Sequence, residues 1–307
     1  MKNFVIFIFF SMCCLQLSAQ YFTISDQMVY GGTAEDYPVD MLEADDGGYF
    51  LLVRSTSEQT GNKTAIKHSD NGSGIDYWLV KTDSLFQNEW QLSYGGNDTG
   101  QFDKNEPCCL DMDNSKNIYL FGTSDSDISG NKIVSSYGGQ DFWYIKMDQN
   151  GNEISQKTFG GGSNDFMNDA LIVNDKIFMT GWSVSDSSGV KTGFQRGGGD
   201  YWLICADTAG NILWEKTYGG EADDYPYTIS YDEESKLIYL MGISRSDISY
   251  EKSEDEMGGD DYWLLKINAL NGNLISDKTI GSYGYEGTSA SCMYLYNNSI
   301  QPIFPVS

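Results

Sequence analysis

The stretch Ile75–Lys81, "IDYWLVK", decides the fold of this 307-residue chain because the chain repeats it. It returns as "QDFWYIK" from Gln140, as "GDYWLIC" from Gly199 and as "DDYWLLK" from Asp260. Near-identical phrases that recur about every 60 residues indicate a repeat architecture, in which each copy is one supersecondary unit. The chain is therefore predicted to be an array of similar units.

Other signals fall into the same register in every copy. A Tyr-Gly-Gly or Phe-Gly-Gly turn opens each unit, at Tyr30, Tyr94, Phe159 and Tyr218, and a decayed version stands at Ile280. A G-x-S-x-S motif ends an apolar run in three copies, and Val53 replaces its glycine in the first copy. The units run over about 30–93, 94–158, 159–217 and 218–279, with a partial copy at 280–307.

Each unit contains four short apolar runs. In the second unit they are Pro107–Met112, Ile118–Thr123, Asp141–Met147 and Glu153–Thr158. Runs of this length that are rich in β-branched and aromatic residues and bounded by Gly, Asn and Asp are typical of strands. No window carries the apolar stripe of a helix. Four antiparallel strands per repeat are typical of a propeller blade, so the predicted fold class is all-β, a β-propeller of four-stranded antiparallel blades.

One tryptophan occupies the same place in the third strand of each unit. These residues are Trp78, Trp143, Trp202 and Trp263. A single blade buries too little apolar surface by itself, so neighbouring blades must pack face to face. We expect the four indoles to be the largest buried groups at these interfaces.

The propeller is expected to have about five blades, four complete and one split between the two ends of the chain. Residues 280–307 contain the strand-like runs "SASCMYLYN" and "SIQPIFPVS", which would be the first two strands of the fifth blade. Residues 21–29 lie where every other unit has its outermost strand. No segment supplies the third strand, so either the fifth blade is incomplete or the chain is a truncated fragment of a longer ring, and an edge is left exposed.

Residues 1–19 read as a secretory signal peptide, and residues 20–307 as a single propeller domain. An apolar run at residues 4–10 precedes the small-residue exit Leu17-Ser18-Ala19, which favours cleavage after Ala19. The run is too short to span a bilayer stably, and no later segment is apolar enough to do so. Lipidation at Cys13 is the alternative, disfavoured by the bulky Met12 before it. We expect an exported protein that is periplasmic, at the outer surface or secreted.

The net charge limits the ligands that the chain could bind, and the cysteine spacing indicates whether disulfides form. The 44 acidic and 19 basic residues give a formal net charge of −25, which leaves no basic footprint for a nucleic acid and attracts only cations or basic partners. Beyond the signal peptide the cysteines are Cys108, Cys109, Cys205 and Cys292. Their spacing gives no disulfide framework. We expect buried free thiols, with Cys108 and Cys109 on opposite faces of a strand; one bridge, Cys205 to Cys292, is the alternative.

The repeated phrase resembles the SBBP-type β-propeller repeats of bacteria, in the version common in exported proteins of Bacteroidetes. Gly219-Gly220, Asp200-Tyr201-Trp202 and the run Gly210–Tyr218, "GNILWEKTY", match this pattern best. The likeness covers about residues 21–290 and implies a propeller fold, but such repeats occur mostly in uncharacterised proteins and imply no activity. Many relatives continue into a C-terminal sorting domain for type IX secretion, which this chain lacks before Ser307.

An acidic residue follows each glycine pair. These residues are Asp36, Asp165 and Asp224, with Asp103 as the equivalent after a small insertion. In a propeller they would stand near the mouth of the central channel, where a ring of carboxylates could bind a cation or a basic group. The favoured alternative is structural, with each carboxylate accepting N–H bonds from a Gly-Gly turn. The same alternative applies to a second recurring set, Asp76, Asp141, Asp200 and Asp261.

Other candidate chemistry is weaker. Asp125, Asp127 and Ser129, followed by Gly130, resemble the first half of a calcium loop, but the distal glutamate is missing and a solvated turn is favoured. The G-x-S-x-S motif lacks the histidine partner of a nucleophile elbow, since His68 is the one histidine in the chain. No zinc spacing is present. No cofactor is predicted, and calcium is the one metal with a candidate site.

The connections between second and third strands are long, at about 58–74, 127–139, 186–198 and 247–259. Ligands concentrate where loops are long and variable, so any ligand is expected on that face. We expect a non-enzymatic binding or interaction module for an unknown protein or glycan. A carbohydrate-active hydrolase or lyase that uses carboxylates at the channel mouth is the alternative, and a fragment without a role of its own is a further one.

Overall fold

The computed structural model describes residues 27–69, 74–97, 105–284, 292–296 and 299–303. These residues form strands, turns and loops, and none of them belongs to a helix that could cross a membrane. The signal peptide at 1–19, Cys13, most of the segment 21–29, and Asp103 lie outside the described residues.

Sixteen of the strands form four antiparallel four-stranded sheets, each in simple sequence order. Blade one contains β1 (Asp36–Glu43), β2 (Tyr49–Ser55), β3 (Asp76–Thr82) and β4 (Asn88–Tyr94). Blade two contains β5 (Asn105–Met112), β6 (Ile118–Ser124), β7 (Asp141–Met147) and β8 (Glu153–Phe159). Blade three contains β9 (Asp165–Val173), β10 (Lys176–Ser183), β11 (Asp200–Asp207) and β12 (Ile212–Tyr218). Blade four contains β13 (Asp224–Asp232), β14 (Leu237–Ser244), β15 (Asp261–Asn268) and β16 (Leu274–Ile280).

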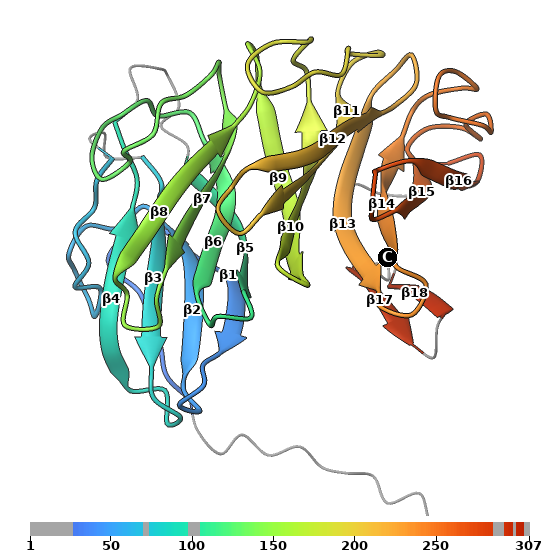
Figure 1. The fold of residues 1–307 in the computed structure, drawn as a ribbon. Helices are drawn as coiled ribbons and strands as arrows, with labels where there is room; N and C mark the ends of the chain where they lie inside the picture. The colour runs from blue at the N-terminus through green and yellow to red at the C-terminus, as the bar shows by residue number, and fades with distance from the viewer. Residues whose placement is uncertain (1–26, 70–73, 98–104, 285–291, 297–298, 304–307) are drawn as a thin grey trace, which may run out of the picture.

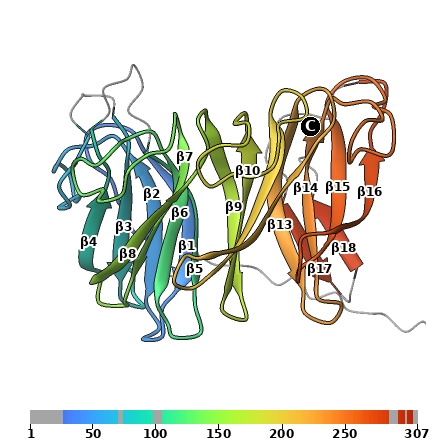
Figure 2. The ribbon, with the colours of Figure 1, turned by 45° about the horizontal axis from the view of Figure 1, so that its top comes forward.

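The four sheets follow one another around a common axis, with β1, β5, β9 and β13 as the inner strands (Figures 1 and 2). Each inner strand packs against the inner strand of the next blade. This arrangement confirms the predicted propeller of four-stranded antiparallel blades. Figure 2 shows the long connections at one end of the strands and short hairpins at the other.

A hairpin of β17 (Cys292–Tyr296) and β18 (Ser299–Ile303) follows the fourth blade. β17 packs against β13, which is where the inner strand of a fifth blade would lie. Residues 27–29, the described part of the expected outermost strand, are not in a strand. Among the described strands, no hydrogen-bonded sheet joins the two ends of the chain.

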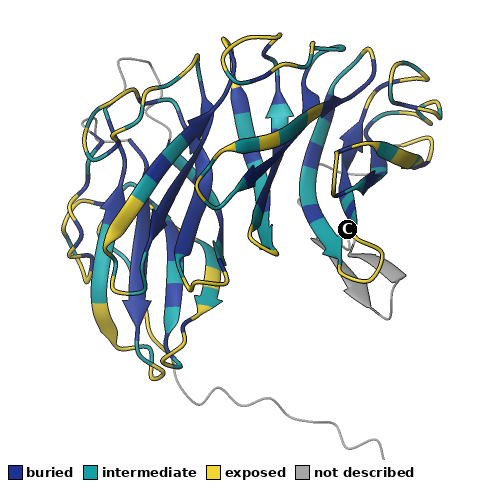
Figure 3. Ribbon diagram, in the orientation of Figure 1, coloured by how far each residue is buried: buried dark blue, intermediate teal, exposed yellow. Residues whose placement is uncertain are grey.

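The core lies between the blades and is aromatic. All four repeated tryptophans are fully buried. Trp143 lies 5.0 Å from Tyr77 of the preceding blade, Trp202 lies 5.0 Å from Phe142, and Trp263 lies 5.0 Å from Tyr201, as ring centroids. Trp143, Trp202 and Trp263 are therefore wedges between blades, as predicted, whereas Trp78 packs in a buried apolar cluster of its own blade. Figure 3 shows this burial along the third strands, whereas the outermost strands are more exposed.

Each inner strand contains a β-bulge at its fourth residue, at Val39, Cys108, Asn168 and Tyr227. The bulge corrects one prediction. Regular alternation would place Cys108 and Cys109 on opposite faces, but the extra residue turns the strand and brings their Sγ atoms to 3.6 Å. Cys205 is a buried free thiol.

Candidate functional site

The aspartates after the glycine pairs are structural hubs of their own blades. The second glycine of each pair, Gly32, Gly161 or Gly220, donates its N–H to Asp36, Asp165 or Asp224 over 2.7 Å. Serines of the G-x-S-x-S motif donate to the same carboxylates. Both kinds of donor belong to the chain itself. This is the geometry expected if these aspartates stabilise the Gly-Gly turns.

Blade two departs from the sequence interpretation at this position. β5 begins at Asn105, which pairs with Ser124 as Asp36 pairs with Ser55 in blade one. The Ser124 hydroxyl donates to Asn105 Oδ1 over 2.6 Å, as the Ser55 hydroxyl does to Asp36 Oδ1. Asn105, rather than Asp103, is therefore the equivalent residue. The amide keeps the acceptor oxygen, and the carboxylate is not repeated in every blade.

The second set of aspartates, at the start of each third strand, holds the long loops. Asp76 accepts the backbone N–H of His68 over 2.6 Å, and Asp141 accepts that of Tyr137 over 2.6 Å. Asp200 accepts that of Arg196 over 2.7 Å, and Asp261 accepts that of Met257 over 2.5 Å.

The same carboxylates explain the first glycine of each turn. A Cβ at Gly160 would come within 1.7 Å of Asp141 Oδ1, and a Cβ at Gly281 within 1.8 Å of Asp261 Oδ1. The decayed turn "IGS" therefore keeps the glycine that the carboxylate requires.

A buried lysine in each long loop was missed by the sequence interpretation. These residues are Lys63, Lys132, Lys191 and Lys252. Lys63 donates to Ser55 Oγ over 2.9 Å and to the carbonyl of Ser57 over 2.6 Å. Its Nζ also lies 5.6 Å above the ring centroid of Trp78, a cation–π contact. The sequence carried a signal in three copies, where Lys63, Lys132 and Lys191 stand two residues after a glycine. In the fourth copy Tyr250 takes the place of the glycine and also has a positive φ.

Burial lowers the pKa of Lys63, Lys191 and Lys252 from the ordinary lysine value, and the nearby aspartates oppose that shift. Buried charges of opposite sign are tolerated when they are paired and hydrogen-bonded. Each of these lysines thus holds its loop on the blade through hydrogen bonds and through attraction to the nearby carboxylates.

Three further aspartates, Asp40, Asp111 and Asp169, join the inner strands near the axis. In each, Oδ1 accepts the N–H of the following residue over 2.7–2.9 Å. In each, Oδ2 accepts an N–H from the inner strand of the next blade, at Leu110, Ile172 and Ile229, over 2.6–2.9 Å. Burial raises the pKa of Asp169 to about 6 and also raises that of Asp111. These carboxylates satisfy edge N–H groups that a β-strand would otherwise leave unpaired.

The predicted calcium half-loop holds its own polar contacts. Asp127 Oδ1 accepts the N–H of Ser136 over 3.3 Å, and the Ser129 hydroxyl donates to the carbonyl of Asn97 over 2.9 Å. Within the described ranges, no group of three or more His, Cys, Asp and Glu residues is placed to hold a metal ion.

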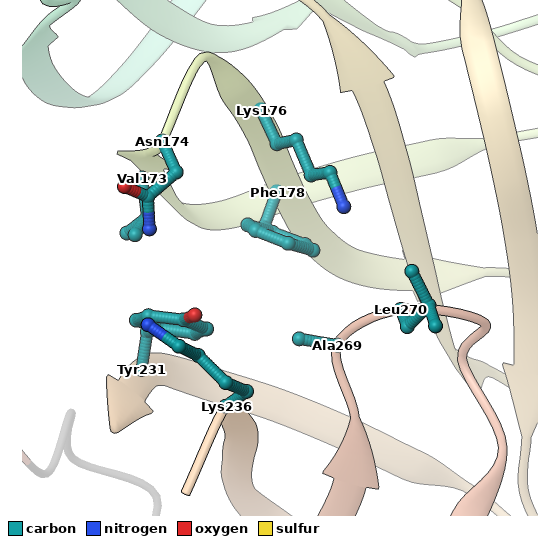
Figure 4. A pocket seen from close by; sticks show the side chains of 8 residues that line it. All are labelled: Val173, Asn174, Lys176, Phe178, Tyr231, Lys236, Ala269 and Leu270. Carbon is teal, nitrogen blue, oxygen red and sulfur yellow. The ribbon is translucent and has the colours of Figure 1, made fainter. Parts of the chain in front are cut away.

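A cleft of about 300 Å³ opens between blades three and four, at the end of the strands that carries the short hairpins. Phe178 and Tyr231 stack along it with ring centroids 6.3 Å apart. Val173, Asn174, Lys176, Lys236, Ala269 and Leu270 complete the lining (Figure 4). The cleft lies at the opposite end of the strands from the long loops. The sequence had predicted any ligand on the face of those loops.

Two other clefts are lined in part by carboxylates, and these carboxylates form hydrogen bonds or ion pairs with other residues of the chain. In a cleft of about 530 Å³, Glu215 accepts the indole N–H of Trp202 over 2.7 Å, and Glu251 forms an ion pair with Arg196 at 2.8 Å. A third cleft, of about 670 Å³ on blade one, includes Asp36 and Asp40, which accept N–H bonds from Gly32 and Leu110.

No family model and no curated protein matches the chain. Among solved structures it is similar to an apocarotenoid oxygenase from Synechocystis, with a TM-score of 0.42 and 12% identity over 84% of this chain and 52% of the other. It is also similar to B. megaterium levansucrase (TM-score 0.40, 8% identity, 81% and 69% covered) and to BamB from Moraxella catarrhalis (0.35, 14%, 85% and 65%). The chain spans about half the length of the oxygenase. Likenesses at these scores say nothing about what this chain binds.

Proposed function

We propose that this chain is an exported, non-enzymatic β-propeller that acts as a binding module for a glycan. The supporting observation is that each recurring carboxylate accepts a hydrogen bond from the chain's own donors on at least one of its two oxygens. Asp224, for example, accepts from Gly220 N–H and from the Ser246 hydroxyl. A general acid or base must instead reach the proton that it transfers on the substrate. This pattern favours a binding role over a hydrolase or lyase.

The cleft between blades three and four offers the surface that a glycan needs. Sugar rings carry an apolar C–H face, which stacks on aromatic side chains, and hydroxyl groups, which take hydrogen bonds. Tyr231, which stacks on the buried Phe178, supplies the aromatic wall. Lys176 lies at the rim, as do Lys236 and Asn174, whose side chains also contact Glu233. Its volume of about 300 Å³ lies at the lower end for ligand pockets, which suits one or two sugar rings.

The test is a screen of neutral and acidic oligosaccharides against the protein, followed by calorimetric titration of the best ligand. Tyr231→Ala should weaken binding about tenfold or more, a loss of about 1.4 kcal/mol, because it removes the stacking surface. The matched control is Phe194→Ala, which removes an exposed aromatic side chain from a long loop at the other end of the strands. Failure of every oligosaccharide to bind, or equal losses in both variants, would contradict the proposal.

Two companion measurements address the enzyme and calcium alternatives. New reducing ends or unsaturated products after incubation with a bound oligosaccharide would establish a hydrolase or lyase instead. A calorimetric unfolding transition that shifts upward with calcium, and no longer shifts in Asp127→Ala, would place calcium in the half-loop of Asp125, Asp127 and Ser129. The mass of the exported protein tests the first step of the proposal, since cleavage after Ala19 leaves a chain that begins at Gln20.

A further inference from the structure

The bulge of β5 brings together two thiols that no other blade has. The bulged residue and the one after it are Val39 and Asp40 in blade one, Asn168 and Asp169 in blade three, and Tyr227 and Thr228 in blade four. In blade two they are Cys108 and Cys109, and their Sγ atoms lie 3.6 Å apart. The shared backbone geometry therefore imposes the approach of the two sulfur atoms, and the sequence of blade two makes it chemically reactive.

The two thiols differ in their surroundings. Cys108 is half-buried, whereas Cys109 is 8% exposed and its Sγ lies 3.7 Å from the carbonyl oxygen of Ala170 on β9 of the next blade. The hydrogen bond with Cys108 and burial hold the pKa of Cys109 well above its ordinary value. A reagent from solvent would therefore meet Cys108 first, and Cys109 is placed to react only with its neighbour.

We propose that Cys108 and Cys109 form a redox-active vicinal dithiol, which a low-molecular-weight disulfide converts into a disulfide between the two neighbouring residues. The Cys108 thiolate attacks one sulfur of the small disulfide, an S–S bond forms to Cys108, and one small thiolate leaves. Cys109 loses its proton to solvent and attacks Cys108 Sγ, so that the second small thiolate leaves. The protein loses two hydrogens, and one small disulfide is reduced to two thiols.

This site is a reversible switch rather than a permanent staple. Consecutive Cα atoms are about 3.8 Å apart, closer than the ~4.4–6.8 Å of ordinary disulfides, and disulfides with unusual geometry are more easily reduced. Closing the ring draws Cys109 Sγ toward Cys108 and away from Ala170. Oxidation therefore acts on the contact between blades two and three.

The test treats the full chain with glutathione disulfide and locates the products by intact mass and peptide mapping. The wild-type peptide that contains both cysteines should become lighter by two hydrogens and should retain no glutathione. Cys109→Ser should stop at the mixed disulfide and keep one glutathione on Cys108, and Cys108→Ser should not react at this peptide. Retention of glutathione by the wild type, or the same product from wild type and Cys109→Ser, would overturn the proposal.

A second measurement needs no variant of the pair. Phenylarsine oxide condenses with two adjacent thiols and releases water, so one equivalent should protect both cysteines of the wild type from alkylation. Cys205→Ser serves as the control, because Cys205 is buried on β11 and its loss should leave the protection unchanged. Alkylation of Cys108 at an undiminished rate in the presence of the arsenical would contradict a dithiol at this bulge.

Discussion

Each blade has one face that can pack against the preceding blade, and this face has the same residue pattern in all four blades. In blades two, three and four the preceding blade covers it, whereas no described blade precedes blade one. The sixth residue of each inner strand shows the contrast. Leu110, Ala170 and Ile229 are 7%, 7% and 6% exposed because the preceding blade covers them. Met41, at the same place in blade one, is 56% exposed.

The tryptophan wedge follows the same division. Trp202 packs on the ring of Phe142 in the preceding blade. Trp78 is also fully buried, but its buried apolar cluster, Val53, Ala65 and Val80, comes from blade one itself. The cleft of about 670 Å³ opens along this face, lined by Met28, Val29 and Met41 among others. A blade thus buries its own indole, and the neighbouring blade adds the second half of the interface.

The largest expected effect is on stability, and it is measured by removing one tryptophan between two blades and one on the face of blade one that has no described preceding blade. Trp202→Ala should lower the free energy of unfolding by about 3–5 kcal/mol, because it empties a tightly packed site between two blades. Trp78→Ala should cost less, about 2 kcal/mol, because among the described residues its buried apolar contacts come from its own blade. Guanidinium unfolding followed by fluorescence and circular dichroism measures both. Equal losses would remove the distinction between the two faces.

A smaller contrast is expected at the sixth position of the inner strands. Leu110→Ala should cost about 2–4 kcal/mol because it leaves a cavity between blades one and two. Met41→Ala should change the stability by no more than about 0.5 kcal/mol, as for other exposed positions. Thermal unfolding of the matched pair gives the comparison. A large loss in Met41→Ala would mean that another surface covers this face in solution.

The smallest expected effect is a pH dependence whose largest contributions come from aspartates of blades two and three, which have a neighbour on each side. Burial raises the pKa of Asp200 to about 7 and those of Asp141 and Asp169 to about 6. The folded protein therefore binds protons that the unfolded chain releases, so stability rises as the pH falls from about 7.5 to 5. Calorimetry should show a Tm that is a few degrees higher at the lower pH.

Asp200→Asn should flatten part of this dependence, because the amide keeps an acceptor for the N–H of Arg196 but does not titrate. Asp148→Asn is the control. Hydrogen bonds from Asn152 lower the pKa of Asp148, so that carboxylate stays ionised throughout the same pH range. A Tm that falls on mild acidification would contradict the assignment.

Local sequence signals predicted the strands well. The runs expected at Asp141–Met147 and Glu153–Thr158 are β7 and β8, with one residue added to the second. The tryptophans were also placed correctly. Short runs of β-branched and aromatic residues, and the turn residues that bound them, act within a few positions of the chain, so they can be recognised without knowledge of the neighbouring blade.

Polar groups were harder to assign. The equivalence of Asn105 to Asp36 depends on where β5 begins. The approach of Cys108 to Cys109 depends on a bulge that the sequence does not indicate. Asp40 and Asp169 gave no signal at all, because their partners Leu110 and Ile229 lie on the next blade.

The sequence by itself determined the number of complete blades, their strand order and the aromatic residue that each one buries, because these follow from a pattern repeated along the chain. Only the tertiary structure decided which carboxylate oxygens already accept hydrogen bonds, which face of blade one no other described blade covers and which thiols meet. Those outcomes depend on contacts between residues on different strands or different blades, and on backbone irregularities that sequence periodicity does not encode.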